Sequence, residues 1–208
     1  MPEIKRIVNN LLATNTYIYF LDEKKCLIID PGSDYKNIKD FIDESGLQPE
    51  AILATHGHFD HVASAAQLQK DFNCKLYLHK KDLKTLKLSN FMMKMFSLKG
   101  SIEIPKPDIT FDDSAEFEIL NKKVFFFHTP GHTYGSCVIK IDDNLFTGDT
   151  LFYSKVSSKI PNESAKMLTE SQKLVFERFS ENLLALPGHG DSGLLKDVKK
   201  AMPLSINN

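Results

Sequence analysis

Three histidines and an aspartate stand within six consecutive residues of this chain, in the pattern H-x-H-x-D-H: His56, His58, Asp60 and His61. In a chain with seven histidines, such a string would arise by chance on the order of once per thousand sequences. In extended backbone, residues two apart point to the same side, so His56 and His58 can present two imidazoles to one metal ion. Asp60 and His61 are adjacent and must diverge, which suits a second ion beside the first.

A simpler interpretation is a polar loop that caps a helix beginning at Val62, with Asp60 as the N-cap. Capping does not require three histidines, so the metal interpretation is favoured. The pattern also differs from the helical H-E-x-x-H arrangement, in which two histidines four apart surround one zinc ion. Four groups cannot complete two coordination shells, so further ligands must come from elsewhere in the chain.

Three further strand ends carry a glycine beside a candidate ligand. Each follows an apolar run typical of a buried strand, at about 125–128, 144–147 and 183–186. Glycine lets the backbone turn sharply, and open α/β sheets place their ligand sites outside strand ends. Taken singly, such a residue would more often belong to a turn, but four such strand ends in one chain favour a shared site. The additional candidate ligands are His132, Asp149 and His189.

The two remaining histidines have different surroundings. His79 ends an expected strand and is followed by charged residues, and His128 precedes the turn before His132. We interpret both as structural residues or as hydrogen-bond partners behind the ligands, and not as ligands. His128 is close enough in sequence to His132 to orient the site by hydrogen bonding.

Strands and helices alternate twice along the chain, with hairpins in both halves. In the first half, strands are expected at 17–21, 26–29, 51–54 and 75–79, with helices near 38–46 and over 62–72. In the second half, strands are expected near 115–120, 123–128, 137–142, 144–147 and 183–186, with helices within about 162–180 and near 191–200. This order predicts an α/β fold in which two packed sheets are covered by helices. No low-complexity linker interrupts the chain, so residues 1–208 are expected to form one domain.

Composition argues against several classes of function. The 208 residues are 42% hydrophobic and 25% charged with a formal net charge of −1, so no global field favours nucleic acid or an anionic membrane. No apolar stretch approaches the roughly 18 residues of a membrane span, and the N-terminus has no apolar signal region. Cys26, Cys74 and Cys137 show no pairing pattern, which is typical of a reducing compartment. A cytoplasmic location is therefore expected.

Two stretches between the halves allow two interpretations each. The lysines at 80, 81, 84 and 87 are interpreted as the solvated face of a helix rather than as a patch for phosphate or an acidic substrate. The methionine-rich stretch 91–96 is interpreted as the buried side of a helix. Its alternatives are a cover over an apolar substrate and a contact between subunits.

In order and spacing, these segments resemble the metallo-β-lactamase superfamily, and within it the glyoxalase II-like (hydroxyacylglutathione hydrolase-like) branch. The resemblance spans essentially the whole chain. It is carried by Asp30-Pro31-Gly32, the H-x-H-x-D-H block, Thr129–Thr133, Phe146–Phe152 and Pro187–Gly190. It implies a four-layer αββα sandwich of mixed α/β (α+β) class, with metal ions at one edge of the two sheets.

The resemblance also implies how the candidate ligands divide. His56, His58 and His132 would bind the first metal ion, Asp60, His61 and His189 the second, and Asp149 would bridge the two. Imidazole and carboxylate ligands suit two divalent ions, with zinc as the first candidate and iron or manganese as alternatives. A metal-bound hydroxide would attack an ester-like bond, and a thioester of acylglutathione type is the expected substrate.

Four further residues have expected roles around this centre. Asp60 is the expected catalytic residue, which orients the hydroxide or carries its proton. Thr133 and Tyr134, just beyond His132, are the expected substrate contacts, and Asp30 is an expected hydrogen-bond partner behind the ligands. The expected partner is a small-molecule substrate, without nucleic acid or membrane, and a homo-oligomer is left open.

Three departures from the family pattern concern the substrate side. The family often has Gly-Gly soon after the histidine block, where this chain has residues 63–66, Ala-Ser-Ala-Ala. Relatives commonly carry a Gly-Arg-x-Asp turn where this chain has residues 153–159. The chain ends soon after His189, without the C-terminal helical domain that helps glyoxalase II enzymes bind glutathione. The hydrolytic core is expected to be retained, while recognition of glutathione lies outside the resemblance.

Several alternatives remain at this point. Iron-dependent persulfide dioxygenases share the histidine block but use one iron, whereas flavodiiron proteins have Glu in place of His58 and need a flavin domain. A lactonase or phosphodiesterase of the same superfamily is a further candidate. A nuclease is disfavoured, because the balanced charge shows no basic groove. The non-enzymatic alternative is a metal-stabilised interaction module.

Overall fold

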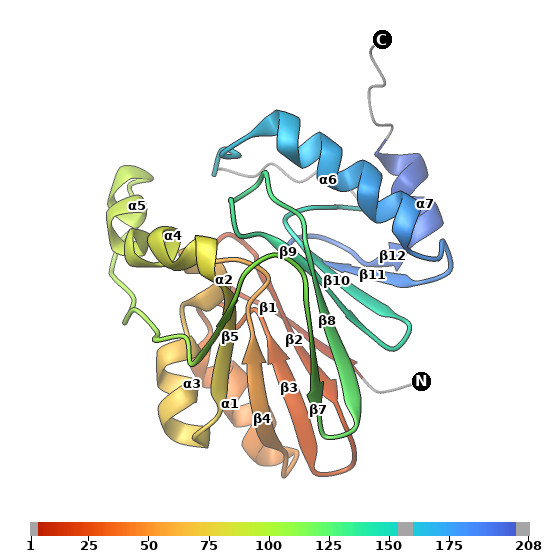
Figure 1. Ribbon diagram of the computed structural model, residues 1–208. Coiled ribbons are helices and arrows are strands. Elements are labelled where there is room, and N and C mark those ends of the chain that lie inside the picture. The colour runs from red at the N-terminus through yellow and green to blue at the C-terminus, as the bar shows by residue number, and fades with distance from the viewer. Residues whose placement is uncertain (1–3, 154–159, 203–208) are drawn as a thin grey trace.

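The apolar runs of the chain form two six-stranded β-sheets that pack face to face, as the computed structural model in Figure 1 shows. The structure describes residues 4–153 and 160–202. The first sheet, in the order β1-β2-β3-β4-β5-β6, contains Ile4–Val8, Asn15–Phe20, Lys25–Ile29, Gln48–Leu53, Lys75–His79 and Ile109–Phe111. The second sheet runs from β7 to β12 and contains Ala115–Ile119, Lys122–His128, Cys137–Ile141, Asn144–Gly148, Leu184–Pro187 and Gly193–Leu194.

Parallel pairing in the first sheet brings two strand ends to the same edge. Strands β3 and β4 are parallel and are joined through helix α1 (Tyr35–Glu44), a crossover of the kind that parallel strands require. Strand β3 ends directly before Asp30, and β4 ends two residues before Thr55, where the histidine block begins. The two polar segments therefore start side by side.

The second sheet delivers three more strand ends to this edge. Strands β8, β9 and β10 are successively antiparallel, so β8 and β10 run in the same direction. Strand β11 is parallel to β10 and follows it through helix α6 (Ala165–Arg178). The loops after β8, β10 and β11 carry His132, Asp149 and His189, so the topology accounts for their approach.

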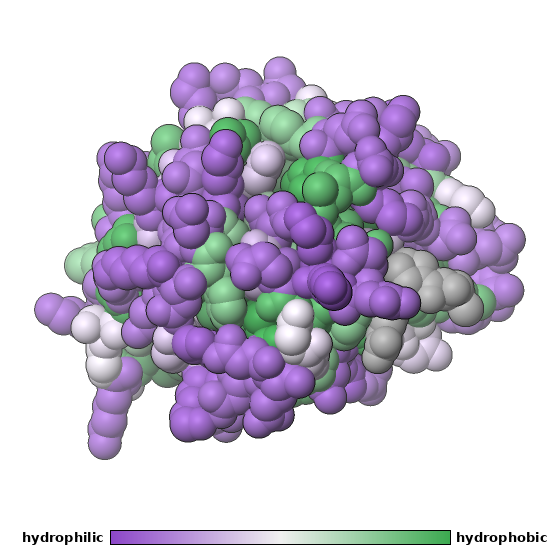
Figure 2. All heavy atoms as spheres, turned by 90° about the horizontal axis from the view of Figure 1, so that it is seen from below, coloured by the Kyte–Doolittle hydropathy of each residue, from purple (hydrophilic) through white to green (hydrophobic). Residues whose placement is uncertain are grey.

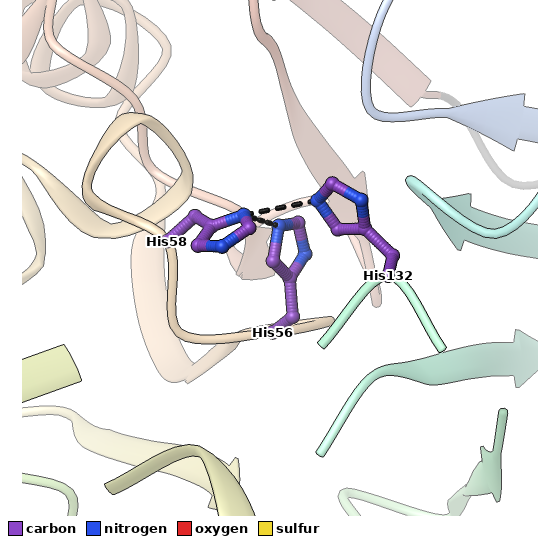
Figure 3. Close-up of side chains that lie close together, drawn as sticks. All are labelled: His56, His58 and His132. Atoms are coloured by element: carbon purple, nitrogen blue, oxygen red, sulfur yellow. Dashed lines mark hydrogen bonds between the residues drawn. The ribbon is translucent and has the colours of Figure 1, made fainter. Parts of the chain in front are cut away.

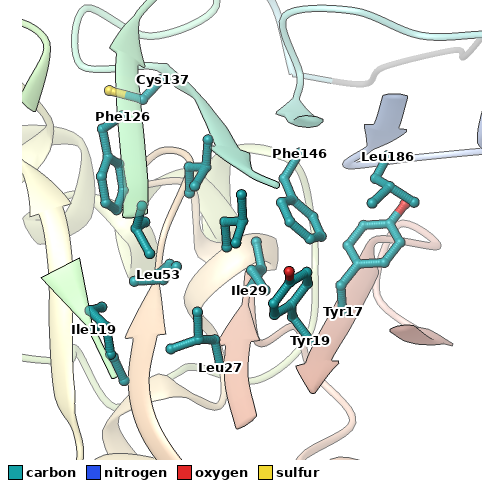
Figure 4. Packing of buried hydrophobic residues seen from close by; sticks show 14 of the residues in the cluster. Tyr17, Tyr19, Leu27, Ile29, Leu53, Ile119, Phe126, Cys137, Phe146 and Leu186 are labelled. Atoms are coloured by element: carbon teal, nitrogen blue, oxygen red, sulfur yellow. The ribbon is translucent and has the colours of Figure 1, made fainter. Parts of the chain in front are cut away.

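The central core lies between the two sheets and follows the period-two pattern of the strands (Figure 4). Tyr17 and Tyr19 of β2 point into it, while Ile18 between them packs on the other side of the sheet. In β8, Phe126 joins the central core and its neighbour Phe125 faces outward. This alternation gives each sheet two apolar faces, and burial of both faces drives helices onto the outside.

The outer faces are covered by helices from each half. Helices α1 and α3 (Ala65–Phe72) bury apolar residues such as Ile38 and Leu68 against the first sheet. Helices α6 and α7 (Leu195–Ala201) bury Val175 and Val198 against the second. The result is a four-layer αββα sandwich of α/β class, which confirms the predicted fold.

Two predicted helices begin or break at other positions than expected. The helix expected over 62–72 is divided into α2 (Phe59–Val62) and α3, because Ser64 bonds back to the loop after β3: its amide donates to Pro31 O at 3.1 Å and its hydroxyl to Gly32 O. The helix expected near 191–200 starts only at Leu195, since residues 193–194 pair with β11 as strand β12.

The segment between the halves forms a short 3₁₀ turn (Lys80–Asp82) and helices α4 (Leu83–Lys87) and α5 (Ser89–Met95). The four lysines of this segment are exposed, as predicted for a solvated face. In the methionine-rich stretch, Met93 is buried, whereas Phe91 and Met95 are 60% and 64% exposed. The predicted buried side of a helix is therefore confirmed only for Met93 and its partly buried neighbours.

Polar side chains cover most of the face seen in Figure 2, where hydrophobic residues appear as separate patches. Within the described part of the chain, the helices are all too short or too polar to cross a membrane.

Candidate metal centre

The seven candidate ligands come together at the edge shared by the two sheets. Their donor atoms form three groups in which all atoms lie within 4.8 Å of one another: His56 with His58 and His132, His56 with His61 and Asp149, and Asp60 with His61 and His189. Every member of these groups is buried. Four loops, separated along the chain, thus supply one compact cluster.

The first triad consists of His56, His58 and His132, whose rings turn their nitrogens toward one another (Figure 3). His58 Nδ1 lies 3.1 Å from His56 Nε2 and 2.9 Å from His132 Nε2. One proton on His58 Nδ1 can serve only one of these two contacts. A cation among the three nitrogens would satisfy all of their lone pairs at once.

Contacts on the far side of the rings indicate which nitrogen carries the proton. His132 Nδ1 donates to Asn162 Oδ1 at 2.9 Å, and His189 Nδ1 donates to Leu12 O at 3.1 Å. His56 Nδ1 lies 3.1 Å from the Thr55 hydroxyl. With Nδ1 protonated, the Nε2 atom of each of these three histidines keeps its lone pair directed into the cluster. This is the form of histidine that a metal ion needs.

Asp30 connects two of these histidines from behind. Its Oδ2 accepts from His61 Nδ1 at 2.9 Å and from the Thr55 hydroxyl at 2.6 Å, while its Oδ1 accepts from the Thr55 amide at 2.7 Å. Because the Thr55 hydroxyl donates to Asp30, it must accept from His56 Nδ1. One buried carboxylate thereby orients both His56 and His61.

Asp149 lies between the two triads. Its Oδ2 is 3.3 Å from His132 Nε2 and 3.5 Å from His189 Nε2, and its Oδ1 is 3.4 Å from His61 Nε2. Asp60 Oδ2 completes the second triad at 3.4 Å from His189 Nε2 and 3.6 Å from His61 Nε2. This position of Asp149 suits a ligand shared by two ions.

Three buried atoms of the cluster have no hydrogen-bond partner: Asp60 Oδ1, His61 Nε2 and Asp149 Oδ1. Buried polar atoms are nearly always paired, because an unpaired one loses its hydration without compensation. Asp60 and His61 belong to the second triad, and Asp149 lies between the triads, so one cause, metal ligation, would explain all three unpaired atoms. The donor set therefore fits bound divalent metal ions.

For the first triad and Asp149 the protonation states also fit metal binding, which requires neutral histidines and ionised carboxylates. Burial, followed by the nearby histidines, lowers the pKa of His56 well below its usual value and that of His58 to about 3. Burial raises the pKa of Asp149, but His132 and His61 outweigh it and hold that pKa well below the ordinary value. Burial lowers the pKa of His189, yet the carboxylates of Asp149 and Asp60 raise it to about 9. The second triad is thus the more proton-binding of the two.

Thr133 and His128 lie beside the cluster and contact groups other than its ligands. Thr133 is fully buried, and its hydroxyl donates to Asp82 Oδ2 at 2.8 Å, so it holds the loop. His128 does not bond to His132; its Nε2 donates to Tyr134 O at 2.9 Å, and its ring stacks on His79. Tyr134 is 49% exposed and remains a candidate substrate contact.

Several residues of the site carry no sequence signal. Thr14 donates its hydroxyl to Asp60 Oδ2 at 2.8 Å, and Asn162 Oδ1 accepts from His132 Nδ1 at 2.9 Å. Both are single polar residues without a motif, in segments far from the histidine block. Thr14 is recognised as part of the site only because the residue directly before β2 lies against Asp60. Asn162 is recognised only because its loop packs on His132.

Glycines allow this close approach where the loops meet. A Cβ atom on Gly188 would lie 2.4 Å from Asp149 Oδ1 and 2.5 Å from His61 Cε1, which no side chain can occupy. Gly148, with φ +47°, would place a Cβ 2.5 Å from the Thr55 hydroxyl. Gly188 is therefore required by packing, and Gly148 by packing as well as by its turn.

Four αββα layers with histidine–aspartate triads at one edge define a class of metal-dependent enzymes. The family model described as the Metallo-beta-lactamase superfamily matches residues 9–203, and the chain belongs to this superfamily. The predicted superfamily is confirmed.

Individual relatives agree with this assignment. The chain is 31% identical to a probable metallo-hydrolase of Methanocaldococcus jannaschii, over 84% of this chain and 87% of the relative. It is also 31% identical to a hydroxyacylglutathione hydrolase of Shewanella loihica, over 84% of this chain but 62% of the relative. The named relatives therefore support a metal-dependent enzyme of the metallo-hydrolase type.

Two solved structures share the whole fold. The B3 metallo-beta-lactamase BLEG-1 superimposes with a TM-score of 0.88 at 27% identity, covering 99% of this chain and 100% of that one. TTHA1623, solved in a di-iron-bound form, superimposes with a TM-score of 0.81 at 27% identity, covering 96% and 98%.

Proposed function

We propose that the chain is a dinuclear metal-dependent hydrolase of ester-like bonds, with a thioester of acylglutathione type as the first substrate class to test. The observation that carries the proposal is the position of Asp149 between two buried triads, within 3.5 Å of His132, His61 and His189. The relative from Shewanella loihica, a hydroxyacylglutathione hydrolase, supports the choice of substrate class.

We assign the ligands as the sequence predicts. The first ion would be held by His56, His58 and His132, the second by Asp60, His61 and His189, with Asp149 shared. Zinc is the first candidate, with iron or manganese as alternatives, and the di-iron form of TTHA1623 supports including iron. Divalent ions at such a centre lower the pKa of water to about 7 and polarise a carbonyl oxygen.

Asp60 is the proposed catalytic carboxylate. The Thr14 hydroxyl occupies its Oδ2 at 2.8 Å, while its Oδ1 is buried and without a partner. The opposing histidines keep the pKa of Asp60 low although burial raises it, so the carboxylate is ionised. An ionised Oδ1 held in this way can orient an attacking water and accept its proton.

On the substrate side, Tyr134 is the proposed contact. Its backbone is fixed from two directions, because its amide donates to Glu163 Oε2 at 2.6 Å and its carbonyl accepts from His128 Nε2 at 2.9 Å. A fixed backbone leaves the exposed phenol as a positioned group beside the loop of His132. The residues 154–159, where the family's Gly-Arg-x-Asp turn is replaced, lie outside the described residues.

We propose a single domain, a small-molecule substrate and a cytoplasmic location, without a nucleic-acid partner. The formal net charge of −1 and three buried cysteines that form no disulfide support this setting. A homo-oligomer is a further possibility, and a measurement of the mass in solution tests it.

The test combines metal analysis with a substrate panel on the purified protein. We expect about two divalent ions per chain and hydrolysis of acyl-glutathione thioesters, with lactones, phosphodiesters and a β-lactam as comparison substrates. His58→Ala and Asp149→Ala should abolish turnover and lower the metal content. Wild-type rates in either variant would reject the assignment.

The persulfide dioxygenase alternative is distinguished by oxygen uptake. Consumption of oxygen with glutathione persulfide, together with one iron per chain and no thioester cleavage, would replace the proposed hydrolase with that activity. Two bound ions without turnover of any substrate in the panel would instead support a metal-stabilised interaction module.

A further inference from the structure

A buried carboxylate outside the ligand set joins the two loops that carry the first triad. Asp82 is fully buried at the end of the 3₁₀ turn after β5. Its Oδ2 accepts from the Gly57 amide at 2.7 Å and from the Thr133 hydroxyl at 2.8 Å. Its Oδ1 accepts from the Gly135 amide at 2.7 Å.

These three donors lie beside the ligands in sequence. Gly57 stands between His56 and His58, and Thr133 directly follows His132. Asp82 therefore ties the loop that carries two histidines of the triad to the loop that carries the third. Among the described residues, Asp82 makes no hydrogen bond to a ligand side chain, so any effect on the centre must act through the backbone of these loops.

The packing around Asp82 leaves no room for a side chain where the two loops reach it. A Cβ on Gly135 would lie 2.5 Å from Asp82 Oδ1, and a Cβ on Gly57 would lie 2.9 Å from Asp82 O. Both loops thus use glycine at the point where they reach Asp82. Ser136 adds to the same junction, because its Oγ accepts from the Thr133 amide at 3.0 Å.

Burying the Asp82 carboxylate costs folding free energy, because the charge loses its hydration. This cost argues against a role in stability alone. Burial raises the pKa of Asp82 to about 6, although three hydrogen bonds lower it. Well-packed apolar groups often stabilise such a position as well as or better than a buried charge does. A buried acceptor that binds three donors fixes geometry, and fixed geometry is what a metal centre requires.

The second triad has a corresponding clamp on the other side of the cluster. Asn15 of β2 is buried, and its Nδ2 donates to Pro187 O and Gly190 O, both at 2.9 Å. Its backbone amide donates to Gly188 O at 2.7 Å. These three carbonyls surround His189 in sequence, so Asn15 holds the loop that carries it.

We infer that each half of the metal centre has its own positioning residue: Asp82 fixes the histidines of the first triad, and Asn15 fixes His189 in the second. The inference rests on the proposed metal centre. It predicts that the affinity of one half can be weakened without weakening the other, because the two clamps share no contacts.

The experiment uses two isosteric substitutions in the full chain, Asp82→Asn and Asn15→Asp. Asp82→Asn turns an amide donor toward a group of donors, and Asn15→Asp turns a carboxylate toward carbonyls. Each is combined with His189→Ala, which leaves the first triad, and with His58→Ala, which leaves the second. Zn²⁺ affinity is measured by competition with a chromophoric chelator, without any assay of activity.

In the His189→Ala background, Asp82→Asn should weaken zinc binding by roughly 10–100-fold, the usual effect of removing a residue behind a metal ligand. In the His58→Ala background the same substitution should leave zinc affinity almost unchanged. Asn15→Asp should show the opposite pattern. Equal weakening in both backgrounds, or in neither, would overturn the inference.

Controls separate this result from misfolding and from failure of the proposed function. Asp112→Asn, at an exposed carboxylate that pairs with Lys80, should change neither affinity. If Asp82→Asn does not fold, Thr133→Val removes one of the three donors, and it should give a smaller loss confined to the first triad. Wild-type protein that binds no zinc would refute the metal centre itself, whereas two bound ions with no effect of either clamp would refute only the inference.

Discussion

Asn162 Oδ1 accepts a hydrogen bond from His132 Nδ1 at 2.9 Å, although 30 positions of sequence separate the two residues. The segment before α6 is held there by a second bond, in which the Glu163 amide donates to His132 O at 3.1 Å. Asn162 thereby fixes the tautomer of His132 and leaves its Nε2 directed at His58 and Asp149. A residue without any motif controls the orientation of a predicted ligand.

Replacing Asn162 by alanine should loosen this ring. We expect Asn162→Ala to reduce zinc affinity or turnover by about 10-fold or more, while Asn162→Asp, which keeps an acceptor, should retain most of both. Zinc titration and steady-state kinetics measure the effect. Gln69→Ala is the matched control, since that amide bonds Lys106 O and Asp108 away from the site. An Asn162→Ala protein with wild-type zinc affinity would contradict the orienting role.

Gly188 provides a test of how tightly the ligands are packed. Gly188→Ala would place a Cβ 2.4 Å from Asp149 Oδ1, so Asp149 or the loop must move. Displacement of a reacting group by about 1 Å can cost on the order of 100-fold in rate, and we expect a loss of at least that size.

Gly46 is the control for this substitution. It has φ +64° and open space at the Cβ position, so Gly46→Ala should cost only about 1–2 kcal/mol of stability from backbone strain and leave turnover intact. Thermal unfolding and kinetics of the two variants separate strain from displacement. Similar activities in both would show that the centre tolerates the shift.

Removal of metal should change both activity and stability. Without cations, the cluster retains unpaired atoms at Asp60, His61 and Asp149, so ions that bind only the folded state should stabilise it. When the free metal concentration is 100 times the dissociation constant, the free energy of unfolding rises by about 2.7 kcal/mol. This corresponds to a rise in Tm of roughly 5–10 °C for a chain of this size. Dialysis against a chelator, followed by calorimetry with and without zinc, iron or manganese, measures it. Activity that survives exhaustive metal removal would contradict the mechanism.

The buried His79, which lies outside the metal cluster, should make the stability of the fold depend on pH. Burial, followed by the neighbouring His128, lowers the pKa of His79 to about 4 in the folded chain. The unfolded chain takes up this proton near pH 6.5, so the contribution of His79 to stability is complete above that pH and is lost as the pH falls toward 4.

His79→Phe should therefore flatten the stability profile of the metal-free protein. The ring still packs on Phe111, at a centroid distance of 5.4 Å for the histidine, but it no longer titrates. Between pH 7 and pH 5, the free energy of unfolding of the wild type should fall by about 1–2 kcal/mol more than that of the variant. Urea unfolding at these pH values measures the shift. Parallel profiles for the two proteins would show that His79 does not titrate in this range.

The amino-acid sequence by itself determined the strands, their alternating faces and the chemistry at their ends. Tyr17 and Tyr19 point to the central core because of the period-two pattern, and His56 and His58 share a side because they are two residues apart. These are local properties of the chain, so a single sequence contains them. The glycine at each strand end likewise marked His132, Asp149 and His189.

Only the tertiary structure decided which side chains meet. Asp82, Asn162 and Thr14 are ordinary loop or strand residues until the two sheets pack and bring their loops to one edge. Thr133 was expected to face a substrate but is buried against Asp82, because the turn after β5 lies on the loop of His132. Hydrogen-bond partners distant in sequence depend on the packing of whole layers, and no spacing along the chain encodes that packing.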